Sequence, residues 1–390
     1  MMDYNSILSD NVKKLQPSGI RKFFDILEEM NDETAISLGI GEPDFVTPWH
    51  IRDAGIYSLE KGFTKYTGNA GLSRLRQAVA KYLERRFSLS YDPMNQIIIT
   101  VGGSEALDLA VRAMVNPGDE VIVPVPSFVC YGPITQLACG NPVYVETKVE
   151  NEFRLTPQEL RAAITPRTKL LVLPYPNNPT GGIMERADLE AIAEVLRGTD
   201  IMVLSDEIYG ELTYGQPHVS IASIPDMYDR TIVVNGFSKT YAMTGWRMGY
   251  VCGPKEIVRQ MLKIHQYAIM SAPTTSQYAA IEAVTEGDSD IETMRAEYDY
   301  RRRYMLDGLH QIGLPCFEPK GAFYMFPCIK STGLSSETFC ERFLLDKKVA
   351  VIPGNAFGEG GEGFVRMCYA SSVANIAEAL RRMGEFLKTI

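Results

Sequence analysis

Short runs of apolar residues alternate with amphipathic stretches through the middle of the chain. The apolar runs predict strands over residues 96–101, 120–126, 169–176, 201–207, 230–239 and 248–253. Between them, apolar residues at helical spacing predict helices over residues 104–115, 127–139 and 185–196. Because the strand segments lack polar alternation, they indicate a mostly parallel sheet that is buried on both faces. The pattern therefore predicts an α/β unit over about residues 51–284.

The two ends of the chain differ from this alternation. Toward the N-terminus we expect an amphipathic helix over residues 18–30, an extended segment over 36–45 and a helix over 71–86. Toward the C-terminus a charged helix over 294–312 precedes short apolar segments within 321–329, 349–354 and 364–370, and then a final helix. We therefore predict a large α/β domain over residues 49–290 and a smaller α+β domain built from residues 1–48 and 291–390.

Composition and charge exclude several classes of function. The 390-residue chain carries a formal net charge of −9, and an acidic surface repels phosphate backbones, so we expect no nucleic-acid partner. The N-terminus lacks the apolar core of a signal peptide, and no apolar run approaches the ~20 residues that span a bilayer. The seven cysteines are odd in number and none form C-x-x-C, which argues against a disulfide framework or a zinc site. We expect a cytoplasmic protein with no membrane partner and no metal.

A lysine and an aspartate each stand at the end of a buried predicted strand. Lys239 comes after the apolar residues 231–234 and a glycine-containing turn. Burial at the mouth of a strand lowers the pKa of a lysine amine, as Schiff-base chemistry requires, although a solvated loop lysine is the alternative. Asp206 ends the strand that begins at residue 201. A carboxylate at that end of a sheet can hold a protonated ring nitrogen, or it can cap a helix.

Two glycine- or asparagine-rich turns also follow predicted strands. In TVGGSEAL, two glycines precede a helix, and the backbone N–H groups of such a helix start can bind phosphate. The G-x-G-x-x-G dinucleotide fingerprint is absent, and the segment could be a plain turn. In PNNPTGG (176–182), Asn178 could donate to a phenolate oxygen, or the segment could again be a simple polar turn.

The order of these segments is more specific than any one of them. GEPDF (41–45), GGSEAL (102–107), NNPTG (177–181), SDEIY (205–209) and SKTYAMTGWR (238–247) occur in that order. Together they resemble the class I/II, fold-type I aminotransferases that depend on pyridoxal 5′-phosphate (PLP). The resemblance extends from about residue 18 to the C-terminus and favours the subgroup of bacterial aspartate, aromatic amino acid and N-acetyl-diaminopimelate aminotransferases. It implies amino transfer between an L-amino acid and a 2-oxo acid such as 2-oxoglutarate, with PLP as cofactor, in a homodimer.

The resemblance also implies roles for individual residues. Lys239 matches the lysine that bonds to PLP and moves the proton, and Asp206 matches the partner of the pyridine nitrogen. Asn178 and Tyr209 match donors to the phenolic oxygen, and Phe128 matches an aromatic ring stacked on the cofactor. The residues that match phosphate ligands are Gly103, Ser104, Glu105, Ser238 and Arg247, with Tyr66 reaching the partner's phosphate. The residues that match the substrate site are Arg366 as clamp for the α-carboxylate, Gly41 and Asn178 beside it, and Ser18 and Ile20 near the distal group.

The substrate is less sharply indicated. Some aspartate-preferring members carry a lysine where this chain has Ser104, and losing a charged donor weakens the binding of an anionic group, although Ser18 is retained. SGIRKFFDIL, PSFVCY and KGAFYMFP resemble aromatic aminotransferases, whereas VLPYPNNPTGG resembles the N-acetyl-diaminopimelate branch of lysine biosynthesis. A PLP-dependent cysteine-sulfur β-lyase on the same fold is a further alternative. A DNA-binding regulator would need an added helix-turn-helix domain, for which about 48 residues are too few.

Overall fold

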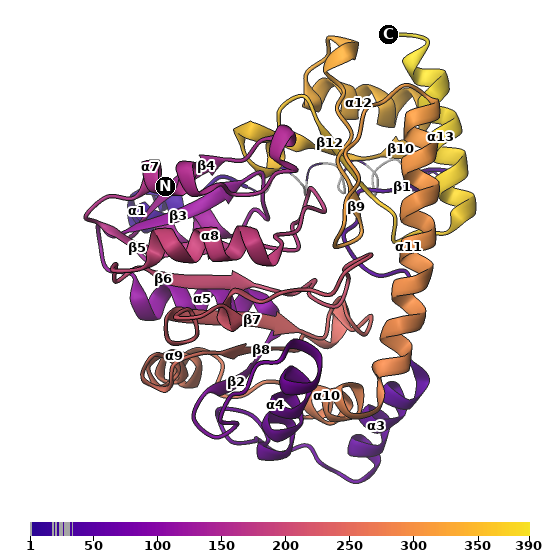
Figure 1. Ribbon diagram of the computed structural model, residues 1–390. Helices are drawn as coiled ribbons and strands as arrows, with labels where there is room; N and C mark the ends of the chain where they lie inside the picture. Colours follow the sequence, from indigo (N-terminus) through magenta and orange to yellow (C-terminus); the bar gives the residue numbers. More distant parts are fainter. Residues whose placement is uncertain (1, 18, 20–21, 23–25, 27–31, 33) are drawn as a thin grey trace.

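The computed structural model describes residues 2–17, 19, 22, 26, 32 and 34–390. Its largest element is a seven-stranded sheet with the strand order β2-β8-β7-β6-β5-β3-β4 (Figure 1). The strands are β2 (Ile97–Thr100), β3 (Glu120–Val125), β4 (Asn141–Glu146), β5 (Thr168–Leu173), β6 (Met202–Asp206), β7 (Thr231–Gly236) and β8 (Gly249–Cys252). Only β8 runs antiparallel to its neighbours. The predicted α/β fold with a mostly parallel sheet is confirmed.

Helices cover both faces of this sheet. On one face, α5 (Gly102–Met114) and α9 (Lys255–Ala268) pack against residues such as Ile98, Leu204 and Val234. The helices of the other face and edge are α3 (Trp49–Glu60), α4 (Ser73–Phe87), α7 (Pro157–Ala163), α8 (Arg186–Leu196) and α10 (Thr274–Glu286). Successive strand residues point to opposite faces, and both faces are apolar, which explains the unbroken hydrophobic runs.

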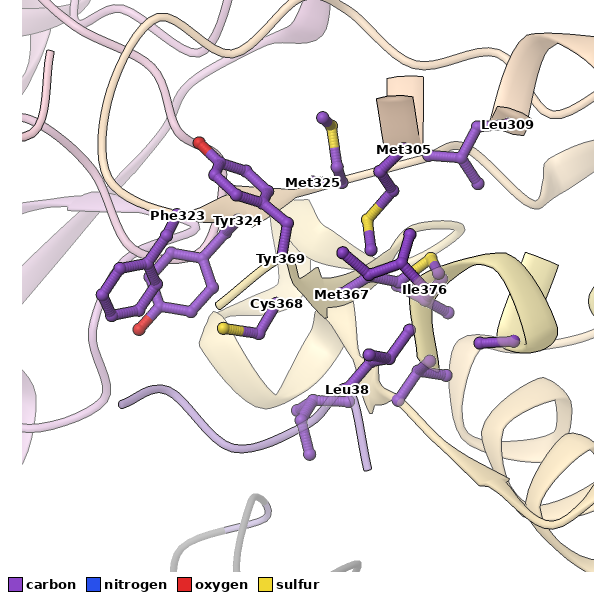
Figure 2. Close-up of a cluster of buried hydrophobic side chains, with 14 of the residues drawn as sticks. Leu38, Met305, Leu309, Phe323, Tyr324, Met325, Met367, Cys368, Tyr369 and Ile376 are labelled. Atoms are coloured by element: carbon purple, nitrogen blue, oxygen red, sulfur yellow. The ribbon is translucent and has the colours of Figure 1, made fainter. Parts of the chain in front are cut away.

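A second core lies beside the large sheet. The N-terminal strand β1 (Ile36–Ser37) pairs parallel with β10 (Val349–Ala350). Another small sheet, which is antiparallel, has the strand order β11 (Ile352–Pro353), β12 (Val365–Cys368), β9 (Tyr324–Met325). Its helices are α11 (Asp288–Gln311), α12 (Ser336–Lys347) and α13 (Val373–Leu387). Figure 2 shows Met305 and Leu309 of α11 converging with Met367 of β12 and Leu38. This arrangement fits the predicted domain division, which stays a prediction.

Several elements differ from their predicted bounds. Helix α6 spans Tyr131–Leu137 and not 127–139, because the Ser127 N–H donates to the carbonyl of Phe357 at 3.0 Å and leaves the helical path. Helix α11 begins at Asp288, six residues before the predicted start, with Asp288 and Asp290 favourable in its first turn. The edge strand β4 has a mixed burial pattern that gave no strand signal. The predicted helix over 18–30 lies largely outside the described residues. Among the described helices, none is long and apolar enough to cross a membrane.

Candidate active site

A cavity of about 350 Å³ opens where the large sheet meets the small one. It lies at the carboxyl ends of β6 and β7, at the N-terminus of α5, and beside Tyr324 of β9 and Arg366 of β12. Ligands of α/β proteins bind at this edge of the sheet. The predicted site residues that line it are Gly41, Gly103, Ser104, Phe128, Asn178, Asp206, Tyr209, Ser238, Lys239, Arg247 and Arg366.

Four predicted site residues are not among the described lining: two are placed elsewhere, and two lie outside the described residues. The Glu105 carboxylate contacts the Val101 N–H and His265, and its side chain is not among the described lining of the cavity. Tyr66 is 82% exposed at the surface, away from the described lining of its own chain's cavity. Ser18 and Ile20 lie outside the described residues. Whether Tyr66 contacts a partner's cofactor stays a prediction.

Lys239 extends from the turn after β7 into the cavity. Its Nζ donates a hydrogen bond to the carbonyl of Gly41 at 2.6 Å and lies 5.7 Å from the centre of the Phe323 ring. Burial lowers the pKa of Lys239 to about 8, because the surroundings solvate an ammonium poorly. Cys368 and Glu42 oppose this shift in the pKa, whereas Arg366 and Arg247 act in the same direction as burial. A substantial fraction of this amine is therefore neutral near physiological pH, as a nucleophile or base must be.

Asp206 is buried at the end of β6, one strand away from Lys239. Its Oδ2 accepts a hydrogen bond from the Tyr131 hydroxyl at 2.7 Å, and its Oδ1 accepts from the Ile208 N–H at 3.2 Å. Burial raises the pKa of Asp206 to about 6, although the Tyr131 hydrogen bond pulls this pKa down. A buried carboxylate with only neutral donors is suited to bind a cation, because the cation offsets its desolvation.

The N-terminus of α5 forms an anion-binding corner. Gly102 has φ +75°, and a Cβ there would lie 2.6 Å from Nη2 of Arg247. A Cβ on Gly249 would lie 2.6 Å from the Gly102 carbonyl carbon, so this glycine lets β8 approach the helix start. Nη1 of Arg247 donates to the carbonyl of Thr244 at 2.9 Å, which anchors the guanidinium. Free N–H groups of a helix start beside an arginine are suited to phosphate.

Arg366 enters the cavity from β12 and is only 3% exposed. Its Nη1 donates to Oδ1 of Asn178 at 2.9 Å, and its Nη2 donates to the carbonyl of Gly39. The guanidinium lies 4.6 Å from the centre of the Tyr324 ring, and Nε has no hydrogen-bond partner among the described residues. Among the described residues, no carboxylate forms an ion pair with the Arg366 guanidinium. The site therefore offers a buried cation to a substrate carboxylate.

Sequence reasoning missed three residues that shape the cavity. Tyr131 donates to Asp206, and Tyr324 shares a 2.7 Å hydrogen bond with the hydroxyl of Tyr209. Both tyrosines stand in segments that resemble aromatic aminotransferases, but neither was assigned a role from the sequence. Glu42 accepts a hydrogen bond from Thr244 at 3.2 Å and also lines the cavity. Its position in the GEPDF motif could have indicated a role at the site.

Comparison with known proteins identifies the family. Residues 33–383 match the family model described as aminotransferase class I and II. The chain is 46% identical to an aspartate aminotransferase of Pyrococcus abyssi over 98% of both chains. It is 45% identical to a Bacillus subtilis protein named "Probable N-acetyl-LL-diaminopimelate aminotransferase", over 98% of this chain and 96% of that one. An aromatic aminotransferase structure from Pyrococcus horikoshii aligns with a TM-score of 0.90 at 43% identity, covering 95% and 99% of the two chains. The chain therefore belongs to the class I and II aminotransferases.

This membership confirms the predicted activity and cofactor. The chain is a PLP-dependent enzyme that transfers an amino group between an amino acid and a 2-oxo acid. The described residues fit PLP: Asp206 offers a buried carboxylate, the start of α5 with Arg247 offers an anion-binding corner, and Lys239 offers an amine of lowered pKa. The peptide bond between Asn178 and Pro179 is cis.

Proposed function

We propose that transamination in this chain is carried by Lys239, Asp206 and Arg366, acting in one cavity. The observation that supports this most strongly is their convergence there from three segments far apart in the sequence. When bound, PLP supplies an electron sink for the bonds at the substrate's α-carbon. The residues that would hold it are Gly103, Ser104, Ser238 and Arg247 at the phosphate, Asp206 at the ring nitrogen, Asn178 and Tyr209 at the phenolic oxygen, and Phe128 against the ring.

In this proposal each polar residue has a separate task. The neutral amine of Lys239 accepts the proton from the substrate's α-carbon and later returns it, since its lowered pKa leaves it available as a base. Arg366 orients the substrate through its α-carboxylate. The ionised Asp206 keeps the ring nitrogen protonated. The same residues would serve both directions of the reaction.

Replacing Arg366 by lysine should weaken all substrates alike. A lysine cannot form the two parallel hydrogen bonds that a guanidinium makes with a carboxylate. We expect the ratio of wild-type to variant kcat/KM to correspond to a loss of about 2–4 kcal/mol in transition-state binding. Other broken buried charge pairs show losses of this size. Steady-state kinetics with two amino donors and two oxo acids measure this effect. A loss confined to one donor class would show that Arg366 does not bind the common end of the substrates.

For the amino donor we propose an aromatic L-amino acid, with 2-oxoglutarate as acceptor. The support is the apolar part of the cavity lining that is not assigned to the cofactor, which includes Ile40, Leu107 and Ile208. Aspartate and N-acetyl-diaminopimelate remain the alternatives, since relatives with those names are equally similar. A donor panel against 2-oxoglutarate ranks the three, and ammonia release from a β-leaving-group substrate would instead indicate a lyase.

Replacing Ser104 by lysine should shift preference toward aspartate. Ser104 lines the cavity, and some aspartate-preferring members of the family carry a lysine at this position, so a lysine there would place a cation within reach of a distal carboxylate. We expect the aspartate-to-phenylalanine ratio of kcat/KM to rise by roughly ten- to a hundredfold, as for a charged hydrogen bond of about 1.5–3 kcal/mol. Ser104→Met adds length without charge and serves as the matched control. An equal rise in both variants would overturn the charge argument.

We also propose that the enzyme is a homodimer. Several apolar side chains around α3 and the end of α9 are exposed, including Trp49, Tyr57, Leu59, Tyr66 and Tyr267. Large apolar side chains with this degree of exposure are typical of a subunit interface, and a two-fold dimer would bury more than about 2,000 Å² in total. Sedimentation at micromolar concentration should give twice the chain mass. A fully active monomer would contradict this assignment.

The compartment that we propose is the cytoplasm. All seven cysteines are free thiols in the structure. Free buried thiols fit a reducing compartment, where disulfides are rare. Fractionation of cells that express the tagged full-length protein tests this location.

A further inference from the structure

Glu105 and His265 make a buried contact directly behind the N-terminus of α5. Glu105 lies in the first turn of α5, and His265 lies in the last turn of α9. Nδ1 of His265 is 2.6 Å from Oε1 of Glu105. The His265 side chain is fully buried, and that of Glu105 is 10% exposed. The contact therefore ties the phosphate-binding corner to a helix that has no lining residue of its own in the described part of the cavity.

The second carboxylate oxygen of Glu105 holds the backbone of this corner. Oε2 accepts a hydrogen bond from the N–H of Val101, the N-cap residue of α5, at 2.5 Å. On the other side of the turn, Oγ1 of Thr100 donates to the carbonyl of Gly102 at 2.9 Å. The path of the chain just before the helix is thus fixed by one buried carboxylate and one hydroxyl.

The direction in which this carboxylate points matters for anion binding. A glutamate in the first turn of a helix is attracted to the free N–H groups of the helix start. Those N–H groups, at Gly103 and Ser104, are the ones that a phosphate in the cavity requires. A donor at Nδ1 of His265 keeps the carboxylate directed toward Val101 and α9. Without that donor, Oε1 would be a poorly paired buried acceptor and would favour the helix start.

The other ring nitrogen shows that packing alone does not account for a histidine here. Nε2 of His265 is buried and has no hydrogen-bond partner among the described residues. Burying an unpaired polar atom is unfavourable, and the surrounding core, with Val258 and Met261 of the same helix, is apolar. An aliphatic residue would pack there without that cost. What histidine adds is the Nδ1 contact to Glu105.

We infer that His265 is a positioning residue for the cofactor phosphate, acting through Glu105. It holds the Glu105 carboxylate on the Val101 N–H and so leaves the first N–H groups of α5 open to the phosphate. The inference rests on the proposed function, because it takes this corner as the phosphate site. In this inference Glu105 holds the backbone next to the phosphate site and does not contact the phosphate itself. The family resemblance had implied a direct contact.

The test compares PLP with pyridoxal, which lacks the phosphate. Dissociation constants of both are measured by absorbance titration for the wild-type enzyme, His265→Leu and His265→Asn. His265→Leu should weaken PLP by about ten- to a hundredfold, by analogy with the loss seen when a residue that orients a metal ligand is removed. Its affinity for pyridoxal should stay unchanged. His265→Asn should restore PLP binding, because its amide N–H replaces the Nδ1 donor.

Two further variants keep the outcome decisive. Met261→Ala, at a buried α9 position of the same core, should lower stability without any loss selective for the phosphate. In the double variant His265→Leu/Glu105→Ala the selective loss should disappear, because no carboxylate is left to bind the helix start. If circular dichroism shows that His265→Leu is unfolded, His265→Met takes its place in both comparisons. Equal weakening of PLP and pyridoxal, or no change in either, would overturn the positioning role. If wild-type enzyme binds PLP no better than pyridoxal, the assignment of the phosphate corner itself is wrong.

Discussion

Replacing Lys239 by alanine is expected to abolish transamination while leaving a residual, non-covalent affinity for PLP. The amine of Lys239 is buried, its pKa is lowered to about 8, and it is the group that we propose moves the α-proton. Loss of proton transfer alone should lower kcat by about 10²–10⁴-fold. The phosphate corner at α5 and Arg247 stays intact in this variant, so PLP should still bind through its phosphate.

Stopped-flow turnover and dialysis separate these two effects. Lys239→Ala should release its PLP on dialysis, whereas the wild-type enzyme should retain it. Lys263→Ala, an exposed lysine of α9, is the matched control and should behave as wild type. Wild-type turnover in Lys239→Ala would remove Lys239 from the mechanism.

Asp206→Asn is expected to lower turnover by one to two orders of magnitude while PLP remains bound. The amide keeps the shape of the side chain but cannot form an ion pair with a protonated ring nitrogen. A hydrogen bond to a charged group contributes about 1.5–3 kcal/mol, which corresponds to that loss. Single-turnover kinetics at saturating PLP measure it directly. Near-normal turnover would mean that Asp206 serves only the local backbone, through its bond to the Ile208 N–H.

The pH dependence of PLP binding gives an independent check on Asp206. Burial raises the pKa of Asp206 to about 6, so the carboxyl is protonated below that pH and ionised above it. In the wild-type enzyme, affinity for PLP should therefore fall as pH falls through about 6, and Asp206→Asn should lack this step. Tyr131→Phe should move the step to higher pH, because the Tyr131 hydrogen bond lowers the pKa of Asp206. A step that stays in Asp206→Asn would belong to another group.

The positions of Lys239 and Asp206 could be predicted because each stands at the end of a buried strand. Their strands, β6 and β7, are parallel neighbours, with Asp206 paired in register to Val234. Carboxyl ends of parallel strands meet at one edge of the sheet, which explains why both side chains line one cavity. The local pattern alone left a solvated lysine and a helix-capping aspartate open, and the family resemblance selected their roles. The same reasoning placed the glycine turn at 102–103 at that edge.

Other parts of the site depend on contacts between segments that are distant in the sequence. The local pattern of hydrophobic and polar residues does not predict such contacts. Arg366 reaches the cavity from a four-residue strand of the small sheet, and only the family resemblance indicated it. Tyr131 was predicted inside a helix, and the tertiary contact of Ser127 with Phe357 moves the helix start to Tyr131. Glu105 stands beside the phosphate turn in the sequence, but His265 directs its side chain away from the cavity.

The measurement that tests the central claim most directly is the identity of the lysine that bonds to PLP. The purified enzyme with its cofactor is reduced with borohydride, digested with trypsin and mapped by mass spectrometry. Because a modified lysine resists trypsin, the label should appear on one peptide that spans residues 231–247 and contains an uncleaved Lys239. A label on any other lysine, or no label on a yellow enzyme, would contradict the site described for this chain.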